Sequence, residues 1–301
     1  MKKPILTELQ QLIARHGRAD GTRLKLLPHV TVARFQTRTE LERYIAGPMF
    51  SLVAQGGKRV GLDRQTFDYG AGEYLITSVD LPISAQVTRA SREAPFLGVG
   101  IALRPKAIAN LLLEIGSTKA ARTYTPAGIG VSTLTDDLID AVIRLLRLLD
   151  NPSDVPVLGP GIEREILWRL LGGPQGTTVR QLGTADSHTF QVSSAIRWIR
   201  ANYPETLRIE ALARVAGMSV TSFHRHFREV TSMTPIQYQK HIRLQEARTR
   251  LMSGADDVTA IGSSVGYDSP SQFSREYRRL FGRPPGQDRE RLRGSNALSA
   301  A

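Results

Sequence analysis

The spacing of hydrophobic and polar residues predicts a region of strands followed by helices. Between residues 28 and 103, short segments rich in Val, Ile, Phe and Tyr are separated by Gly, Pro or Asp, a pattern typical of strands. The expected strands are HVTVARFQ, MFSLVAQGG, KRVGLDRQTFDYG, EYLITSVD, LPISAQVTR and FLGVGIALR. Turn signals recur at intervals of about 8–15 residues, which favours an antiparallel barrel or sandwich.

Helical periodicity surrounds this region on both sides. Apolar residues recur at helical spacing in residues 106–115, 135–149 and 161–171. At the start of the chain, Ile5, Leu9, Leu12 and Ile13 predict an amphipathic helix, and no apolar stretch of the kind found in signal peptides is present. The leucines of residues 138–149 either pack in the core or form a dimer face, and the pattern alone does not decide between the two.

The last third of the chain is predicted to be all helical. A polar stretch, QGTTVRQLGTADSHT, precedes it. We interpret residues 174–190 as a linker between an N-terminal domain, residues 1–173, and a C-terminal domain, residues 191–293; a surface loop within one domain is the alternative. The small polar residues 294–301 predict a disordered tail. The expected fold class is α+β.

A repeated motif lies within the C-terminal domain. The segment GMSVTSFHRHFREVTSMTP, residues 217–235, returns as GYDSPSQFSREYRRLFGRPP, residues 266–285. Matching residues downstream of the turn are 50 positions apart, and those upstream are 49 apart, which is consistent with one residue, Asp268, added in the turn. Two copies are too few for a solenoid, so the repeat predicts a duplicated motif.

Each copy has the pattern of a helix, a tight turn and a second helix. Gly217 and Gly266 end the first helix, where a positive φ is usually required. Small residues, Ala213 and Gly262, lie one helical turn earlier and permit close packing of the second helix. The second helices carry matching N-cap and core residues: Ser219 and Ser269, Phe223 and Phe273. This spacing is typical of a helix-turn-helix, whose second helix enters the major groove of DNA.

The polar face of each second helix supplies candidate DNA contacts. The candidates are Thr221, Ser222, His224, Arg225 and Arg228 in the first copy, and Ser271, Gln272, Ser274, Arg275 and Arg278 in the second. Arg recognises guanine, Gln recognises adenine, and Ser or Thr contacts either a base or a phosphate. The outer arginines, Arg228 and Arg278, are expected to contact phosphate. A solvated helix face is the alternative for either copy alone, and His224 is more often a bystander at such a position.

A long helix predicted over residues 235–252 separates the two copies. At 1.5 Å per residue it spans about 27 Å. One turn of B-DNA is about 34 Å, so one chain can place two recognition helices in successive major grooves. The shortfall favours a bent duplex.

Composition narrows the classes of partner. The 301 residues carry a net charge of +12, with a pI near 10.3, and more than half of the excess lies in residues 188–301, nearly all as arginine. A basic chain attracts polyanions, and Arg suits phosphate and guanine. The absence of cysteine excludes disulfides and thiolate metal sites and fits a cytoplasmic location. The sequence contains no run of about 18 apolar residues, so no membrane span is predicted.

These motifs resemble a known family. GMSVTSFHRHF and GYDSPSQFSREYRRLFGRPP resemble the DNA-binding domain of AraC/XylS-type transcription regulators, and GPMFSLVAQG, LDRQTFDYGAGEYLITSVDLP and GVGIALRP resemble the AraC-type N-terminal domain. The resemblance implies a sequence-specific DNA-binding regulator, usually an activator, with a cupin-like barrel that senses a small molecule or mediates dimerisation. It implies double-stranded DNA, RNA polymerase, a small-molecule effector and a second copy of the chain as partners.

Two alternatives remain open from the residues themselves. One is a constitutive DNA-binding regulator whose barrel only dimerises. The other, a metal-dependent cupin enzyme, is disfavoured because the barrel region holds only His29 and the His224-Arg-His226 triplet lies on a predicted helix, where residues i and i+2 point about 200° apart. No catalytic residue, metal or cofactor is predicted.

A ligand for the barrel is not identified by the sequence. The aromatic residues Phe35, Phe50, Tyr69 and Tyr74 either line a pocket or belong to the core.

Overall fold

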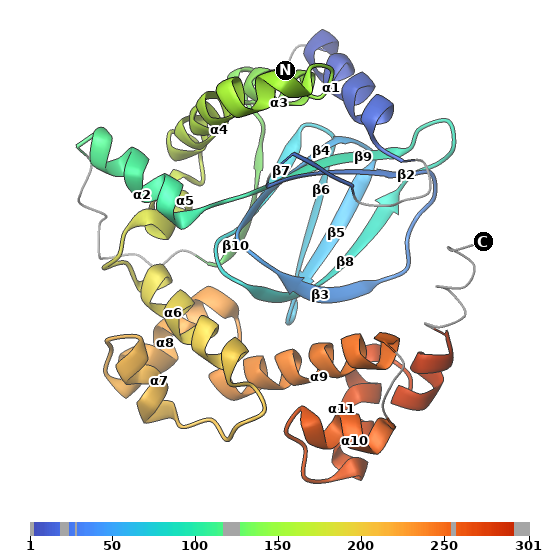
Figure 1. Ribbon diagram of the computed structural model, residues 1–301, viewed down its shortest axis with the longest axis vertical. Helices are drawn as coiled ribbons and strands as arrows, with labels where there is room; N and C mark the ends of the chain where they lie inside the picture. Colours follow the sequence, from blue (N-terminus) through green and yellow to red (C-terminus); the bar gives the residue numbers. More distant parts are fainter. Residues whose placement is uncertain (1–2, 19–23, 28, 117–126, 254–256, 292–301) are drawn as a thin grey trace.

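A computed structural model describes residues 3–18, 24–27, 29–116, 127–253 and 257–291. The expected α+β class is confirmed, because an antiparallel barrel with flanking helices precedes a helical C-terminal part (Figure 1). The strands are β1 (Leu24–Leu27), β2 (Val30–Phe35), β3 (Glu42–Ala46), β4 (Met49–Gln55), β5 (Gly57–Leu62), β6 (Gln65–Gly70), β7 (Glu73–Thr77), β8 (Leu81–Arg89), β9 (Phe96–Ala102) and β10 (Ile129–Thr133).

The strands form two antiparallel sheets in the described part of the chain. One sheet has the order β1-β2-β9-β4-β7-β10 and the other the order β3-β8-β5-β6. Residues 58–70, expected as one strand, form most of the hairpin of β5 and β6, which turns at Asp63 with a φ of 51°. Strands β1, β3 and β10 were not predicted, because they are short and lack a clear alternation of apolar and polar residues.

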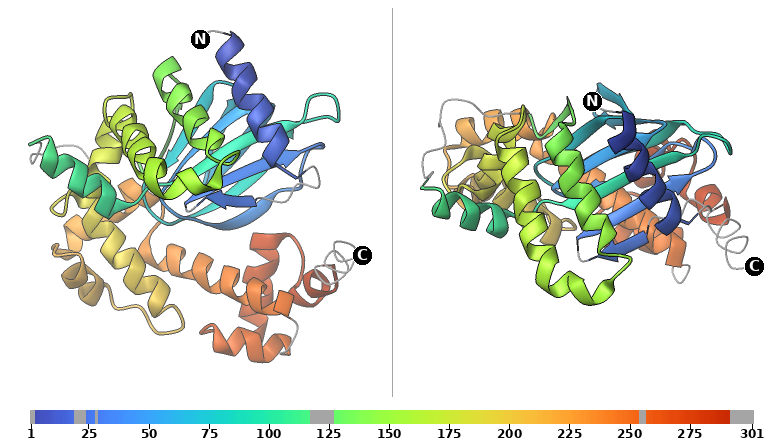
Figure 2. Two further views of the ribbon diagram at one scale, coloured as in Figure 1. Left: turned by 45° about the horizontal axis from the view of Figure 1, so that its top comes forward. Right: turned by 90° about the horizontal axis from the view of Figure 1, so that it is seen from above.

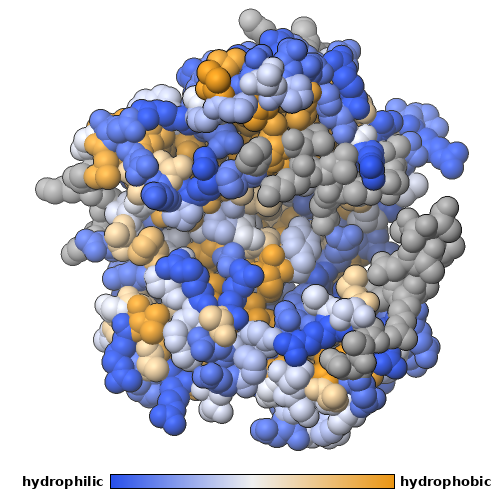
Figure 3. All heavy atoms as spheres, in the orientation of Figure 1, coloured by the Kyte–Doolittle hydropathy of each residue, from blue (hydrophilic) through white to orange (hydrophobic). Residues whose placement is uncertain are grey.

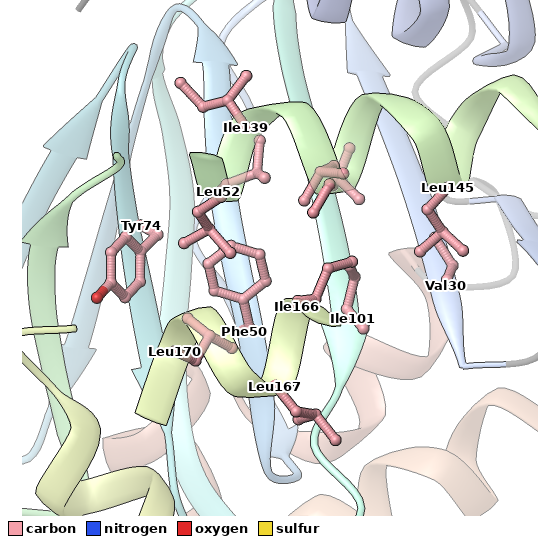
Figure 4. Close-up of a cluster of buried hydrophobic side chains, with 14 of the residues drawn as sticks. Val30, Phe50, Leu52, Tyr74, Ile101, Ile139, Leu145, Ile166, Leu167 and Leu170 are labelled. Atoms are coloured by element: carbon pink, nitrogen blue, oxygen red, sulfur yellow. The ribbon is translucent and has the colours of Figure 1, made fainter. Parts of the chain in front are cut away.

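One face of the six-stranded sheet packs on helices. The N-terminal helices are α1 (Lys3–His16), α2 (Pro105–Glu114), α3 (Asp136–Arg147), the short 3-10 helix η1 (Pro152–Asp154), α4 (Val155–Leu171) and α5 (Gly176–Gly183). Figure 2 shows α1, α3 and α4 over the sheet. In Figure 4, Phe50 and Tyr74 of the sheet meet Ile166 and Leu170 of α4, and the two aromatic rings lie 5.2 Å apart.

The leucines of α3 belong to this core. Leu138, Leu145 and Leu146 are buried against the sheet and α4, and Thr135 caps the helix as predicted by accepting a hydrogen bond from the N–H of Leu138. Burial of these side chains rules out the alternative in which they form a dimer face, because such a face must be exposed in the single chain.

The polar stretch expected as a linker contains a packed helix. Residues 176–183 form α5, which places Val179 and Leu182 in the N-terminal core. Two well-spaced apolar residues are enough to fix one short helix when a neighbouring helix, α2, offers a surface. The division into domains at this stretch remains a prediction. The tail, residues 294–301, lies outside the described residues.

The C-terminal helices follow the predicted order closely. They are α6 (His188–Ala201), α7 (Ile209–Val215), α8 (Val220–Thr231), α9 (Pro235–Ser253), α10 (Val258–Ser264) and α11 (Pro270–Phe281). Helix α9 runs along β3 and β8 of the barrel (Figure 1). None of the helices among the described residues has the length and apolar character needed to cross a membrane.

The barrel and the C-terminal helices share contacts and a core. The barrel interior and the core around α6, α7 and α8 form one continuous cluster of buried apolar side chains. The N–H of Gly128 donates to the carbonyl of Val230 at 3.0 Å, and the hydroxyl of Tyr238 donates to the carbonyl of Asp80 at 2.7 Å. The two parts are therefore docked rather than joined by a chain segment alone.

Candidate nucleic-acid interface

The first helix-turn-helix consists of α7 and α8. Gly217 closes the turn with a φ of +65°. The hydroxyl of Ser219 accepts a hydrogen bond from the N–H of Ser222 and caps α8. Phe223 and Phe227 of α8 are fully buried, and their rings pack edge to face at 5.4 Å. The core side of α8 is thus fixed, and its other side is left to solvent.

The second helix-turn-helix, α10 and α11, repeats this construction. Gly266 has a φ of +93°, and Ser269 caps α11 by accepting from the N–H of Gln272. A Cβ atom placed on Gly262 would lie 2.9 Å from the ring of Phe273. This close approach explains why the smallest residue stands one turn before the turn glycine.

The candidate DNA contacts lie on the sides of α8 and α11 that face away from the two cores. The exposed candidates are Thr221, His224, Arg225, Arg228, Ser271, Arg275 and Arg278, and the half-buried ones are Ser222, Gln272 and Ser274. The side chain of Gln272 donates to Glu276 at 3.4 Å, so its amide is partly engaged within α11. Hydrophilic residues prevail over the C-terminal helices on the face shown in Figure 3. Contact of these residues with DNA remains a prediction.

His226, which the sequence analysis considered only as a metal ligand, is buried beside Arg225. The ring of His226 stacks on that of His188 of α6, with centroids 3.6 Å apart, and its Nδ1 lies 2.8 Å from Glu229. Its Nε2 lies 3.1 Å from the guanidinium of Arg225. Because a guanidinium only donates, Nε2 must accept, and Nδ1–H then donates to Glu229. His226 therefore positions the side chain of Arg225.

Glu276 connects α11 to α9. Its carboxylate accepts from the ammonium of Lys240 at 2.9 Å and from the hydroxyl of Tyr267 at 2.8 Å. Burial raises the pKa of Glu276, but hydrogen bonds from Lys240, Tyr267 and Gln272 outweigh burial and leave the pKa below its ordinary value. Glu276 is buried despite its charge because these donors compensate for the loss of water.

Arg243 of α9 joins the two motifs. Its guanidinium donates to the carbonyls of Tyr203 and Gly266, both at 2.7 Å, and to those of Pro204 at 3.1 Å and Glu205 at 2.9 Å. The segment after α6 and the turn of the second motif are thereby held by one side chain. The spacing of the two recognition helices is therefore fixed by more than the length of α9.

The barrel encloses a cavity between its two sheets. The cavity has a volume of about 280 Å³, and Tyr44, Lys58, Tyr69, Thr77 and Ile83 contribute to its lining. Its wall is mainly apolar, with a few hydroxyl groups and one ammonium group.

Small residues on β9 keep part of this space open. A Cβ atom on Gly98 would lie 3.0 Å from the ring of Phe96, and one on Gly100 would lie 3.0 Å from the sulfur of Met49. Of the four aromatic residues considered from the sequence, Tyr69 lines the cavity, and Phe50 and Tyr74 belong to the core on the helical side of the sheet. Phe35 packs against the second core outside the cavity lining.

Comparison with known proteins agrees with this architecture. The family model of the AraC-type transcriptional regulator N-terminus matches residues 26–178, which is half of the chain. The chain belongs to the AraC family of transcriptional regulators. A helix-turn-helix domain model matches residues 212–291 of this AraC-type chain, from within α7 through the second motif.

Several relatives of the AraC-type chain are regulators by name. The transcriptional regulator ArgR of Pseudomonas aeruginosa is 29% identical over 154 residues, covering 51% of this chain and 47% of ArgR. The activator RhaS of Pectobacterium carotovorum is 30% identical over 105 residues, covering 35% of this chain and 38% of RhaS. The virulence activator VirF of Yersinia enterocolitica is 25% identical over 232 residues, covering 75% of this chain and 82% of VirF. The chain thus spans about half or less of the length of the first two relatives.

A solved structure of similar fold is that of ToxT from Vibrio cholerae. One ToxT structure aligns with a TM-score of 0.57 at 10% identity, covering 88% of this chain and 98% of ToxT. A second is of ToxT with a bound unsaturated fatty acid, with a TM-score of 0.54, 10% identity, and coverage of 86% of this chain and 94% of ToxT. At this level of identity the likeness concerns the fold.

Proposed function

We propose that this AraC-type chain is a sequence-specific DNA-binding activator of transcription that responds to a small molecule in its barrel. The observation that carries the proposal is the pair of helix-turn-helix motifs, each with an exposed arginine at the matching position of the second helix, Arg225 and Arg275. If these helix faces were only solvated surfaces, nothing would require the same packing and an arginine at the same position in both copies. Double-stranded DNA is the partner that this pair fits.

The connection between the motifs supports binding to two successive major grooves. Helix α9 has 19 residues and spans about 28 Å at 1.5 Å per residue. One helical turn of B-DNA is about 34 Å, so the pair fits half-sites one turn apart on a duplex that bends slightly toward the protein. Arg225 and Arg275 read bases, and Arg228 and Arg278 contact phosphates.

The cavity in the barrel supports a small-molecule effector. A mainly apolar enclosure of about 280 Å³ with a few polar groups is typical of a ligand site. ToxT, whose fold is similar, has been solved with a bound unsaturated fatty acid. RNA polymerase and a second copy of the chain complete the set of proposed partners, in the cytoplasm. A regulator without an effector is the remaining alternative.

Binding of the full chain to fragmented genomic DNA, followed by sequencing at a stated salt concentration, tests this proposal. We expect enrichment of a bipartite motif with half-sites about one helical turn apart. Arg225→Ala and Arg275→Ala should each relax one half-site and leave the other. Arg64→Ala, in the exposed turn of β5 and β6, is the matched control and should reproduce the wild-type motif.

Uniform, salt-sensitive binding without any motif would contradict the proposed sequence-specific function. The effector is tested separately by screening small molecules for an increase in melting temperature that a bulky substitution in the cavity, Gly98→Leu, abolishes. An increase that persists in Gly98→Leu would place the ligand outside the barrel.

A further inference from the structure

A second cavity lies between the barrel and the C-terminal helices. It has a volume of about 200 Å³, and its lining includes Pro82 and Ser84 of β8, His241 and Gln245 of α9, and Arg279 of α11. Successive residues of a strand point to opposite faces. Ile83, which lies between them, lines the barrel cavity, so Pro82 and Ser84 face away from the barrel interior. Helix α9 packs along this side of β3 and β8 (Figure 1). We call this cavity the interdomain crevice.

The interdomain crevice collects positive charge from both parts of the molecule. Arg43 of β3 and Arg279 of α11 line it, together with His241. Within the described part of the chain, neither guanidinium donates a hydrogen bond or forms an ion pair. Asp63, exposed at the turn of β5 and β6, is the acidic group among the described lining residues. One carboxylate faces two guanidinium groups and a titratable imidazole.

The local electrostatics disfavour further positive charge on Arg43 and His241. Burial, with a further contribution from Arg248, lowers the pKa of Arg43. Burial also lowers the pKa of His241; Asp63 opposes this effect, and Arg279 and Arg43 reinforce it. The guanidinium of Arg248 is already paired with Asp288 at 2.9 Å. The two arginines therefore disfavour the charged form of His241, and an added negative charge would favour it.

The chemistry of the lining specifies the ligand. Water can accept hydrogen bonds from the guanidinium groups, but it brings no negative charge. An oxyanion brings both acceptor oxygens and negative charge, and planar guanidinium groups donate paired, charge-assisted hydrogen bonds to phosphate or carboxylate oxygens. The hydroxyl of Ser84 and the side-chain amide of Gln245 add neutral donors on opposite walls. A group with two negative charges matches two arginines best.

We propose that the interdomain crevice binds a phosphate group, either as inorganic phosphate or as part of a phosphorylated metabolite. Arg43 holds it from the barrel, and Arg279 and His241 hold it from the C-terminal helices. Such a ligand bridges the two parts of the molecule and stabilises their docking by mass action. It also links the position of α11, which carries the second set of candidate DNA contacts, to the concentration of a phosphate compound. The site shares Ile83 with the lining of the barrel cavity but lies on the other face of β8, and Arg279 is not among the candidate DNA contacts.

Titration of the full chain with inorganic phosphate against chloride, at fixed ionic strength and pH, tests the site. We expect a saturable rise in melting temperature and, by NMR, a rise in the pKa of His241, because a bound anion favours the imidazolium form. Arg43→Gln and Arg279→Gln should each weaken the apparent phosphate affinity about tenfold or more, since each removes charge-assisted hydrogen bonds. Melting in chloride verifies that each variant is folded.

Two control variants distinguish the crevice from other basic surfaces. Arg64→Gln, near the crevice but outside its lining, should bind phosphate as the wild type does. The double variant Arg225→Ala/Arg275→Ala should also keep the response. Loss of the response in this double variant would mean that phosphate binds the DNA-facing helices, and the proposal would be wrong. Unchanged affinity in both crevice variants, or a response that does not saturate, would equally overturn it.

The source of the phosphate group is resolved by comparing two probes. Tighter binding of glycerol phosphate than of inorganic phosphate would indicate a phosphorylated metabolite. Equal or weaker binding of the ester would indicate inorganic phosphate. Failure of DNA recognition would leave this test unaffected, because it measures no DNA binding.

Discussion

Ala213 and Gly262 show how much a single methyl group decides in this molecule. The two residues occupy matching positions in the two motifs. Ala213 is buried beside α8, whereas Gly262 lies so close to Phe273 that a Cβ atom would contact the ring at 2.9 Å. The sequence predicts a small residue at both positions from spacing alone. The requirement for glycine at one of them follows from the distance between α10 and α11.

Gly262→Ala tests this packing. Overpacking of the contact with Phe273 should lower the free energy of unfolding by about 1–3 kcal/mol. Gly286→Ala is the matched control, because a Cβ atom there meets nothing within 4 Å. Urea unfolding of both variants measures the difference. A Gly262→Ala variant as stable as the control would show that α11 adjusts at no cost.

Arg225 and Arg275 are predicted to read bases. Replacing either by alanine should cost about 1–3 kcal/mol at the cognate site and relax the preference at one base position. Arg228→Ala serves as the comparison: it should weaken binding to all sequences similarly and reduce the salt slope by about one unit. Binding isotherms on cognate and random DNA at several salt concentrations separate the two behaviours. Equal losses on both DNAs for Arg225→Ala would contradict base reading.

At the scale of elements, amphipathic helices were predicted well and several strands were not. Helices α8 and α11 each bury one narrow stripe, so their limits and caps follow from local sequence. Strand β3 pairs only with β8, and its exposed, half-buried and buried residues follow no simple alternation. Its place in the sheet is set by β8, which lies about forty residues away in sequence. Non-local pairing of this kind leaves little local signal.

The contact between α9 and α11 should depend on pH through Glu276. Because its pKa is lowered in the folded chain, its carboxylate adds stability above its ordinary pKa of 4.5, and this contribution is lost as pH falls through the lower folded value. Glu276→Gln should therefore be less stable than wild type at pH 7, and the difference should shrink below about pH 4. Urea unfolding at pH 7 and pH 3 measures it. A stability difference between Glu276→Gln and wild type that is the same at both pH values would contradict a contribution from the charge of Glu276.

At the scale of the whole molecule, the barrel and the C-terminal helices meet through specific backbone contacts. The N–H of Gly128 donates to Val230 at the end of α8, and a Cβ atom on Gly128 would lie 2.3 Å from the carbonyl oxygen of Val230. Arg200 of α6 also pairs with Asp80 after β7, and Arg291 pairs with Glu40. The segment before β10 therefore contacts the end of α8 directly.

Gly128→Ala should separate the two parts. A side chain at this position cannot coexist with the contact to Val230, so the docking of α8 on the barrel should weaken. We expect a lower melting temperature and faster proteolysis between the two parts. Gly161→Ala, where a Cβ atom meets nothing within 4 Å, should melt at or slightly above the wild-type temperature. A wild-type melting profile for Gly128→Ala would show that this contact does not hold the parts together.

The sequence by itself determined the duplicated motif, its turns and caps, and the polar faces of α8 and α11, because each of those features depends on residues within a few helical turns of one another. Only the tertiary structure decided which apolar faces form the core, as with the leucines of α3, and which distant residues meet. Arg43, Ser84, His241 and Arg279 are spread over more than 230 positions and share one crevice. Folding brings them together through strand pairing and the docking of the C-terminal helices on the barrel, which no local pattern records.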